Sequence, residues 1–387
     1  MKAIRLCDIC DFQGGAQPPK NQWIDERREG YVRMLQIRDF TQIEKVKPEF
    51  VQISARVKMC KEDDILIARY GASVGKILTG LSGAYNVAIM KTIPDEKKIS
   101  KKYLFYFLSS EYFQKFIMNV GSRAAQAGFN KDDLQNVMLI ERTLEEQQVI
   151  CKVLDKITEL ITNRKTELRL LDKCVKSRFV ELFGDLAAPE CLWKKEKLVS
   201  ICSSSEDIKC GPFGTQLSKD EYCSNGIAVW EIPQINSGFT MQPTHFITEE
   251  KANQLVSYSI RAGDIAMSRK GNVGRCAVFP ETLKDGIIHS DVLRIRVNRK
   301  SALPIFMMHQ LHYSRYVQHQ IELVSSGAIM AGINVTKLKQ IEVHLPPIEL
   351  QKRFAAFVKQ VDKSKYCSQK FEELCRELIK IYEQEWI

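Results

Sequence analysis

DILIARYGASVGK, residues 64–76, has a diverged copy in DIAMSRKGNVGR, residues 264–275. Both stretches begin with an acid and an apolar run, and both continue with an arginine and a turn marked by two glycines. The second copy has one residue fewer between those glycines, and the two acids lie 200 positions apart, at 64 and 264. A repeat at this distance predicts two copies of one domain-sized unit.

Three more pairs of segments repeat in the same order along the chain. An upstream pair is offset by 192 positions and two downstream pairs are offset by 204. Ordered matches with slowly drifting offsets exclude chance similarity and indicate a tandem duplication. The pairs are Leu6, Ile9 and Cys10 with Leu198, Ile201 and Cys202; AGFN (127–130) with AGIN (331–334); and LEEQ (144–147) with IELQ (348–351).

Each copy begins with a part that we expect to be globular. Its first 140 or so residues mix short apolar runs with Gly, Pro and Asn turns, which predicts strands and loops with a few helices. Residues 101–119 predict one helix with a buried face, formed by Leu104, Phe107, Leu108 and Phe116. Its counterpart is expected at residues 302–322.

Each copy then continues into a long helix. The first has apolar residues at alternating spacings of four and three, interrupted only by Arg164, which predicts a coiled coil. Thr143 and Glu146 form a predicted capping box at its start. The alternating positions are Ile150, Leu154, Ile157, Ile161, Arg164, Leu168, Leu171 and Val175.

The second long helix follows Pro346-Pro347, a pair typical of a helix start. Its gap from Val361 to Phe371 is ten residues, where the first helix has eleven between Ile157 and Leu168, and a one-residue deletion would explain this. Its expected apolar face contains Phe354, Val358, Val361, Phe371, Leu374, Leu378 and Ile381.

These parts predict an α+β protein with two homologous domains separated by two long antiparallel coiled-coil helices in a pseudo-two-fold arrangement. The segments are expected at residues 1–142, 143–184, 185–346 and 347–387, with a hinge at Phe183–Pro189. A helix of about 35 residues is roughly 50 Å long. Domains held that far apart could contact one face of duplex DNA about one to one and a half turns apart.

Composition limits the classes of protein that remain. A net charge of +10 and a pI near 8.9 favour a polyanionic partner. No run approaches the roughly 18 apolar residues that span a bilayer, and Met1–Asp8 has no secretory pattern. Twelve cysteines in such a chain indicate free thiols in a reducing cytoplasm.

Enzyme motifs are incomplete wherever they occur. GASVGK (71–76) lacks the four residues between glycines and the hydroxyl residue of a phosphate-binding loop. CDIC (7–10) has no second Cys or His pair, so buried strand cysteines are the favoured interpretation. The six histidines show no ligand spacing, and no Asn-Pro-Pro-aromatic motif of an adenine methyltransferase is present. We therefore expect no catalytic residues and no metal site.

The order of parts resembles the specificity subunit of type I restriction–modification enzymes. Three segments carry the resemblance: GDI (263–265) followed by Arg269 and two glycines, LPPIELQ (345–351), and SRFVELFGD (177–185). The resemblance covers essentially the whole chain. One departure is ERTL (141–144), which stands where the family usually has Leu-Pro-Pro-Leu and which should alter the entry to the helix more than the recognition surface.

This resemblance implies a non-catalytic subunit that binds double-stranded DNA. Each domain would recognise one half of a split, asymmetric site, and the helices would dock two modification (methyltransferase) subunits, which restriction subunits then join. No cofactor would bind this chain, while S-adenosylmethionine, ATP and Mg²⁺ would bind the partner subunits. Coiled-coil scaffolding by duplicated protein-binding domains is the alternative function.

Forked donors and acceptors are needed to recognise bases in the major groove, and some of the candidates would hold phosphates instead. Arg69 and Arg269 could equally be structural, for example by pairing with a core carboxylate, and Asn130 and Asn334 could cap the helices that follow. The four glycines of the repeat are turn formers first. The candidates are Gln36, Arg38, Arg69, Ser73, Lys76, Arg123, Gln126 and Asn130 in the first copy, and Gln234, Asn236, Arg269, Lys270, Asn272, Arg275, Ser325, Ser326 and Asn334 in the second.

Overall fold

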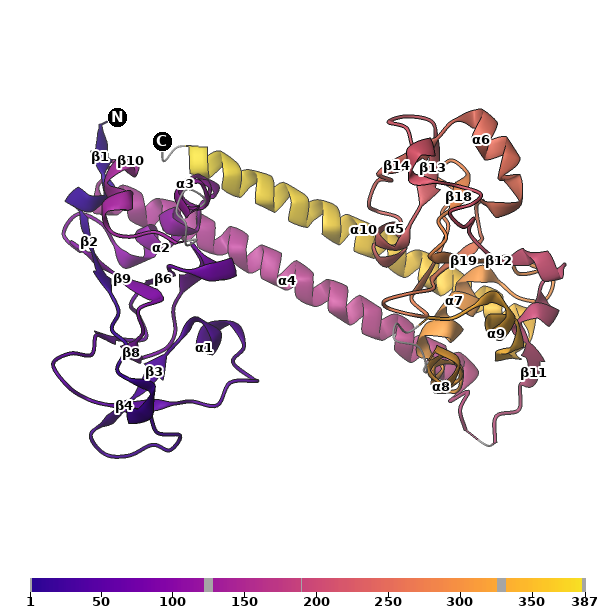
Figure 1. The fold of residues 1–387 in the computed structure, drawn as a ribbon, viewed down its shortest axis with the longest axis horizontal. Coiled ribbons are helices and arrows are strands. Elements are labelled where there is room, and N and C mark those ends of the chain that lie inside the picture. The colour runs from indigo at the N-terminus through magenta and orange to yellow at the C-terminus, as the bar shows by residue number, and fades with distance from the viewer. Residues whose placement is uncertain (1, 122–127, 189, 326–331, 385–387) are drawn as a thin grey trace. The chain divides into compact units, whose positions relative to one another are not determined.

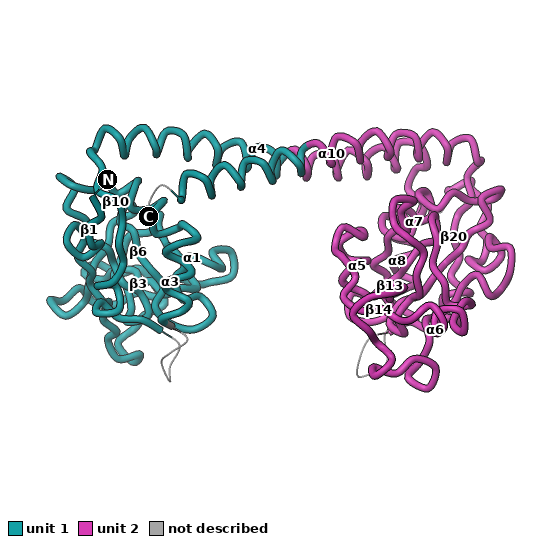
Figure 2. Tube along the Cα trace, turned by 90° about the horizontal axis from the view of Figure 1, so that it is seen from above, with its two compact units in different colours: residues 1–166, 368–387 teal, residues 167–367 magenta. Residues whose placement is uncertain are grey.

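The computed structural model describes residues 2–121, 128–188, 190–325 and 332–384 (Figure 1). The chain forms two compact units: unit 1 comprises residues 1–166 and 368–387, and unit 2 comprises residues 167–367 (Figure 2). Two long helices, α4 (Leu144–Phe183) and α10 (Ile348–Gln384), contribute to both units. The segment boundaries expected at residues 142, 184 and 346 stay predictions.

Unit 1 contains an antiparallel sheet of order β2-β9-β6-β7 and a mixed sheet of order β4-β3-β8-β5, in which β3 and β8 are parallel. A separate antiparallel ladder pairs β1 with β10. The strands are β1 (Ala3–Arg5), β2 (Cys10–Gly14), β3 (Tyr31–Leu35), β4 (Phe50–Gln52), β5 (Met59–Cys60), β6 (Leu66–Ala68), β7 (Ile77–Leu78), β8 (Gly83–Tyr85), β9 (Ile89–Pro94) and β10 (Met138–Ile140).

Unit 2 repeats this topology, and each of its strands carries a number ten higher than its counterpart. Its sheets have the orders β12-β19-β16-β17 and β14-β13-β18-β15, and β11 pairs with β20. The duplication inferred from sequence is therefore confirmed in the fold. The strands are β11 (Lys194–Lys197), β12 (Ile208–Cys210), β13 (Ile227–Trp230), β14 (His245–Ile247), β15 (Ser259–Ile260), β16 (Ile265–Ser268), β17 (Cys276–Val278), β18 (Gly286–Ile288), β19 (Val292–Ile295) and β20 (Glu342–Leu345).

Most helices also correspond between units, apart from α6, and the helix expected at residues 101–119 is two helices. A break at Ser110 separates α2 from α3, and one at Ser314 separates α7 from α8. Both serines are buried, and each hydroxyl accepts a hydrogen bond from the backbone three residues later, as an N-cap does. The shorter helices are α1 (Ile37–Thr41), α2 (Lys101–Ser109), α3 (Glu111–Gly121), α5 (Ile232–Asn236), α6 (Glu249–Gln254), α7 (Pro304–Tyr313), α8 (Arg315–Ser325) and α9 (Val335–Gln340).

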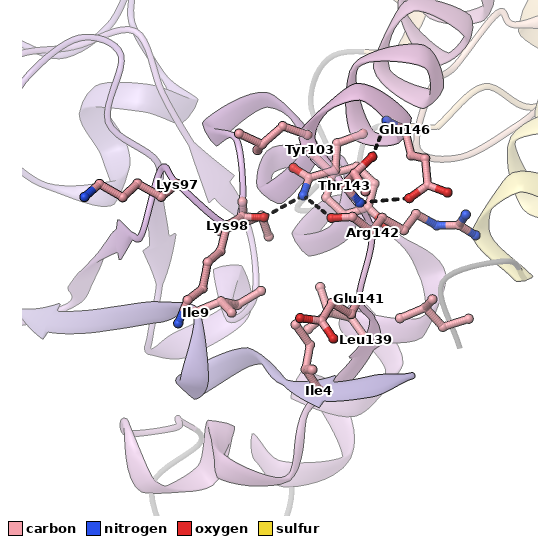
Figure 3. A pocket seen from close by; sticks show the side chains of 14 residues that line it. Ile4, Ile9, Lys97, Lys98, Tyr103, Leu139, Glu141, Arg142, Thr143 and Glu146 are labelled. Atoms are coloured by element: carbon pink, nitrogen blue, oxygen red, sulfur yellow. Dashed lines mark hydrogen bonds between the residues drawn. The ribbon is translucent and has the colours of Figure 1, made fainter. Parts of the chain in front are cut away.

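The start of α4 has the capping box that the sequence predicts (Figure 3). Glu146 N–H donates to Thr143 Oγ1 at 3.2 Å, and Thr143 N–H donates to Glu146 Oε2 at 2.8 Å. The helix ends before Gly184, whose φ of +75° suits a helix C-terminus. The departure from Leu-Pro-Pro-Leu at residues 141–144 therefore leaves a helix with its own cap.

The long helices pair in antiparallel fashion. In unit 1, Ile157 and Ile161 of α4 pack with Cys375 near the end of α10. In unit 2, Phe179 near the end of α4 contacts Phe354 near the start of α10, with ring centroids 5.4 Å apart. This packing confirms the expected α+β fold with long antiparallel helices. Arg164, the polar residue of the expected apolar face, places its guanidinium 4.9 Å from the centre of the Phe371 ring.

The apolar face expected for the second half of α10 is wrong. Leu374, Leu378 and Ile381 are 58%, 47% and 56% exposed, whereas Ser368 and Cys375 are 4% and 3% exposed. The buried and half-buried positions continue the alternation of four and three from Val361 through Lys365, Ser368, Glu372, Cys375 and Ile379, so no deletion between the copies is needed. We call the exposed set the outer stripe: Phe371, Leu374, Leu378 and Ile381.

Candidate nucleic-acid interface

The acid of the repeated motif is structural in both units. Asp64 accepts a hydrogen bond from Lys61 N–H at 2.9 Å and pairs with Lys91 of β9 at 2.5 Å. Asp264 accepts from Arg261 N–H at 2.9 Å and forms a two-pronged ion pair with Arg296, with both N–O distances at 2.7 Å. The four glycines of the motif all have φ between +68° and +85°, so they are turn formers as expected.

The shared arginines bind backbone carbonyls and not a core carboxylate. Arg69 Nε donates to Phe129 O at 3.1 Å, and Nη1 reaches Val87 O at 3.5 Å. Arg269 repeats both bonds, to Ile333 O at 3.2 Å and to Ser290 O at 3.3 Å. Each arginine thus joins the glycine turn to the turn between β8 and β9 or its counterpart between β18 and β19. These hydrogen bonds give both arginines a structural role, although neither side chain is fully buried.

Asn130 and Asn334 act as caps in the structure. Asn334 is the N-cap of α9, and its side chain accepts from Lys337 N–H at 2.8 Å. Asn130 Oδ1 accepts from the N–H groups of Asp132 and Asp133 at 2.8 and 3.2 Å. Both residues are exposed, so the cap leaves part of each amide in contact with solvent.

The mixed sheets place different polar side chains on one shared backbone frame. Leu35 pairs with Tyr85 in unit 1 as Trp230 pairs with Ile288 in unit 2, and Arg33 pairs with Phe50 as Ala228 pairs with Phe246. Three positions at these strand ends therefore correspond. We call Gln36, Glu49 and Asn86 the first trio, and Glu231, His245 and His289 the second trio.

In the first trio, Glu49 receives several donors. Gln36, the N-cap of α1, donates from Nε2 to Glu49 at 3.3 Å, and Arg38 donates to the same oxygen at 2.7 Å. Lys20 pairs with the other carboxylate oxygen. The hydrogen bond from Lys20, followed by the positive charges of Lys20 and Arg38, lowers the pKa of Glu49. Glu49 therefore stays ionised.

In the second trio, a carboxylate lies between two imidazoles. Glu231, the N-cap of α5, has Oε2 at 2.7 Å from His245 Nδ1 and Oε1 at 3.9 Å from His289 Nε2. His245 stacks on Tyr222, with ring centroids 4.7 Å apart. Asp291 N–H donates to His289 Nδ1 at 3.2 Å, and Lys270 pairs with Asp291 at 2.8 Å. The second trio thereby adjoins the turn that Arg269 holds.

The strand register also shows which residue of unit 2 corresponds to the candidate Gln36. Gln36 corresponds to Glu231 and not to Gln234, because Gln36 and Glu231 are the N-caps of α1 and α5. Gln234 is 1% exposed and is engaged in the α5 cap and with Gln242 O at 3.0 Å, which favours a structural role. Five members of the trios, Glu49, Asn86, Glu231, His245 and His289, were missed because only strand register brings them together.

The remaining candidates lie near the glycine turns or outside the described residues. Arg275 is exposed and donates to Asn236 O at 3.4 Å, so it joins α5 to the turn that carries Asn272. Ser73 is half-buried and Lys76 is exposed on the equivalent turn of unit 1, while Ser325 donates to Glu322 O at 3.1 Å. The candidates Arg123, Gln126 and Ser326 lie outside the described residues. All candidate DNA contacts stay predictions.

The described part of the chain contains no group of three or more His, Cys, Asp or Glu side chains arranged to hold a metal ion. None of the helices described is both long enough and apolar enough to cross a membrane.

Several known proteins are similar to this chain. The MjaVIII type I restriction enzyme specificity subunit of Methanocaldococcus jannaschii is 23% identical over 374 residues, covering 93% of this chain and 86% of the relative. The EcoBI specificity subunit of Escherichia coli is 23% identical over 320 residues, covering 77% of this chain and 66% of the relative.

Two solved structures share the fold. The S subunit of a type I restriction–modification system from M. genitalium has a TM-score of 0.56 at 14% identity, covering 99% of this chain and 95% of that one. A chain from the structural work on assembly and conformational transition of the type I R-M system has a TM-score of 0.59 at 17% identity, covering 99% and 96%.

The duplicated topology agrees with a match to a family model. The model of the type I restriction modification DNA specificity domain matches residues 1–170 and again residues 193–374, one match for each copy. Those two matches account for most of the chain. With two copies of this domain on paired long helices, the chain belongs to the family of type I restriction–modification specificity subunits.

Proposed function

We propose that this non-catalytic specificity subunit binds a bipartite, asymmetric DNA site, with each domain recognising one half. The observation that supports this most strongly is the pair of trios: one backbone topology carries different polar side chains at three corresponding positions. A shared frame would give both domains the same approach to a duplex, while different side chains would select different bases. The net charge of +10 favours binding to the phosphate backbone.

The second part of the proposal concerns partners. We propose that the outer stripe is a docking surface for a modification (methyltransferase) subunit. One chain would bind two such subunits, and restriction subunits would join the complex afterwards. The stripe has spacings of three, four and three, which is the pattern on which a further helix packs. Exposed apolar stripes of this kind mark interaction surfaces. S-adenosylmethionine, ATP and Mg²⁺ would bind those partners, and the complex would work in the cytoplasm.

A gel-shift series at rising salt tests the DNA-binding proposal. The purified chain with its modification subunit is titrated onto genomic DNA fragments at about 50 and about 200 mM salt. Counterion release predicts that affinity falls by on the order of a thousandfold between those concentrations. The wild-type chain should also show no methyl transfer or cleavage when it is assayed without any partner subunit.

Three outcomes would contradict this proposal. Absence of binding to DNA at low salt would favour the alternative function, a scaffold whose duplicated domains bind protein. An interaction that survives high salt unchanged would also favour it, because hydrophobic protein interfaces depend little on ionic strength. Methyl transfer by the chain alone would contradict the assignment as non-catalytic.

A further inference from the structure

We infer that the second trio determines which base pair its domain selects, and that it selects a pair presenting an exocyclic amine, from adenine or cytosine, to Glu231. This inference rests on the proposed function. It assigns specificity to Glu231, His245 and His289, side chains that lie outside the repeated glycine turns.

The first step is the position of the trios. In unit 1, Asn86 N–H donates to Leu35 O at 3.1 Å, and in unit 2 His289 N–H donates to Trp230 O at 2.9 Å. The same backbone bond therefore holds each trio at the carboxyl ends of the parallel pairs β3–β8 and β13–β18. Since the frames agree, corresponding side chains should meet corresponding places on a duplex.

The second step is that hydrogen-bond polarity is reversed between the trios. In the first, the side chain at the helix N-cap is the donor, because the Gln36 amide donates to Glu49 at 3.3 Å. In the second, the N-cap side chain is the acceptor, because the Glu231 carboxylate accepts from His245 Nδ1 at 2.7 Å. At this place unit 1 presents an amide, which can both donate and accept, whereas unit 2 presents a carboxylate, which only accepts.

The third step is the capacity left for a ligand. Glu49 already receives Lys20, Arg38 and Gln36. On Glu231, Oε1 is 3.9 Å from His289 Nε2, which is too long for a hydrogen bond, and the side chains of Glu231, His245 and His289 are 18%, 45% and 26% exposed. The Glu231 side chain also accepts from the N3 backbone N–H in the capping box of α5, and Thr244 Oγ1 donates to Oε2 at 3.4 Å. Because a carboxylate can accept about four hydrogen bonds, Glu231 keeps capacity for a further donor. Carboxylates accept from the amines of cytosine or adenine in the major groove.

The fourth step is electrostatic. A carboxylate facing DNA is repelled by phosphates unless cations lie close by. Lys270 lies beside the second trio through its 2.8 Å pair with Asp291, and Arg269 binds Ser290 O at 3.3 Å, one residue from His289. Two positive charges, on Lys270 and Arg269, therefore lie near the two carboxylates of Glu231 and Asp291 and offset their repulsion from phosphates.

The test uses three substitutions in the full chain with its modification subunit. E231Q gives the second trio the amide that Gln36 already presents as an N-cap in unit 1, so it should preserve the start of α5. H245Q is a second variant in the same trio. E250Q, at an exposed acid of α6, makes the same change of charge away from the trio and is the control. The readout is the methyl-adenine motif mapped across the host genome.

The inference predicts that E231Q and H245Q relax or change one or two base positions within one half of the motif. Discrimination at those positions should fall by roughly tenfold or more, while the other half and the E250Q motif stay as in the wild type. A wild-type motif in both folded variants would overturn the inference, as would equal loss of methylation at every site. If the wild-type complex yields no split motif, the proposed function itself fails and the inference fails with it.

Discussion

At the residue scale, the side chains shared by the two copies are engaged in holding the fold. Gln147 accepts from Ser100 N–H at 2.9 Å and donates to Lys98 O at 2.7 Å. Gln351 repeats this arrangement, with Leu303 N–H at 2.9 Å and Ser301 O at 3.3 Å. Both amides are buried. Gln147 thereby links the first turn of α4 to the loop before α2, and Gln351 links the first turn of α10 to the loop before α7. The repeated glutamine therefore has a structural role. Under the proposed function, the positions that differ between the copies are the ones that would recognise DNA bases.

Single residues could be assigned from sequence only where their partners are local. The capping box at Thr143 and the cap at Asn334 involve neighbours three residues away, so spacing was enough to predict them. The carbonyl partners of Arg269 lie 21 and 64 residues away, and those contacts depend on how the sheet folds. The partners of Glu231 are 14 and 58 residues away for the same reason.

Buried histidines in unit 2 predict a stability that falls in mild acid. Burial lowers the pKa of His309 from 6.5 to about 4, while Ile305 O accepts from its Nδ1. Between those values the unfolded chain binds the proton and the folded chain does not, so lowering the pH below 6.5 favours unfolding. Each such histidine should reduce the free energy of unfolding by about 2 kcal/mol between about pH 7 and about pH 5.

Urea unfolding at both pH values checks this expectation, with H309F as the comparison. Phenylalanine keeps an aromatic ring against Phe354 and removes the titrating group. The substitution should reduce the pH dependence but not abolish it, because burial also lowers the pKa of His312 to about 4. An unchanged pH dependence in H309F would show that His309 takes up a proton equally in the folded and the unfolded chain between these pH values.

At the element scale, α10 shows why a heptad pattern can mislead. The helix has two faces with similar spacing, and the outer stripe contains larger apolar residues than the buried face it was mistaken for. Cys375 and Ser368 are small, and they suit the close packing of α10 against α4 in unit 1. A prediction from hydrophobicity alone places the larger apolar residues on the buried face of α10. The face that is actually buried depends on how α10 packs against α4.

Two matched substitutions test which face of the helices carries the stability of unit 1. I157A removes a buried side chain that packs with Cys375, and it should cost about 2–5 kcal/mol of the free energy of unfolding. L374A removes an exposed side chain of the outer stripe and should change that free energy by less than about 0.5 kcal/mol. Denaturant unfolding of the chain without partners measures both. Equal destabilisation by the two variants would show that Leu374 lies on a buried face of α10, as first expected from the sequence.

At the scale of the whole molecule, the duplication made most of the fold predictable. Repeated segments at offsets between 192 and 204 indicated two homologous domains, and the ten strands described in unit 1 all have counterparts in unit 2. The order of strands in each sheet was not predictable, because pairs such as β2 with β9 join residues about 80 positions apart. The trios depend on this long-range pairing, so they emerged only from the structure.

The central claim is that each domain recognises its own half of one split DNA site. The most direct measurement replaces residues 1–142 with the corresponding domain of another specificity subunit and maps methyl-adenine in cells that also express the modification subunit. The account predicts a motif in which one half changes and the other half is retained. A motif in which both halves change, or neither does, would contradict it.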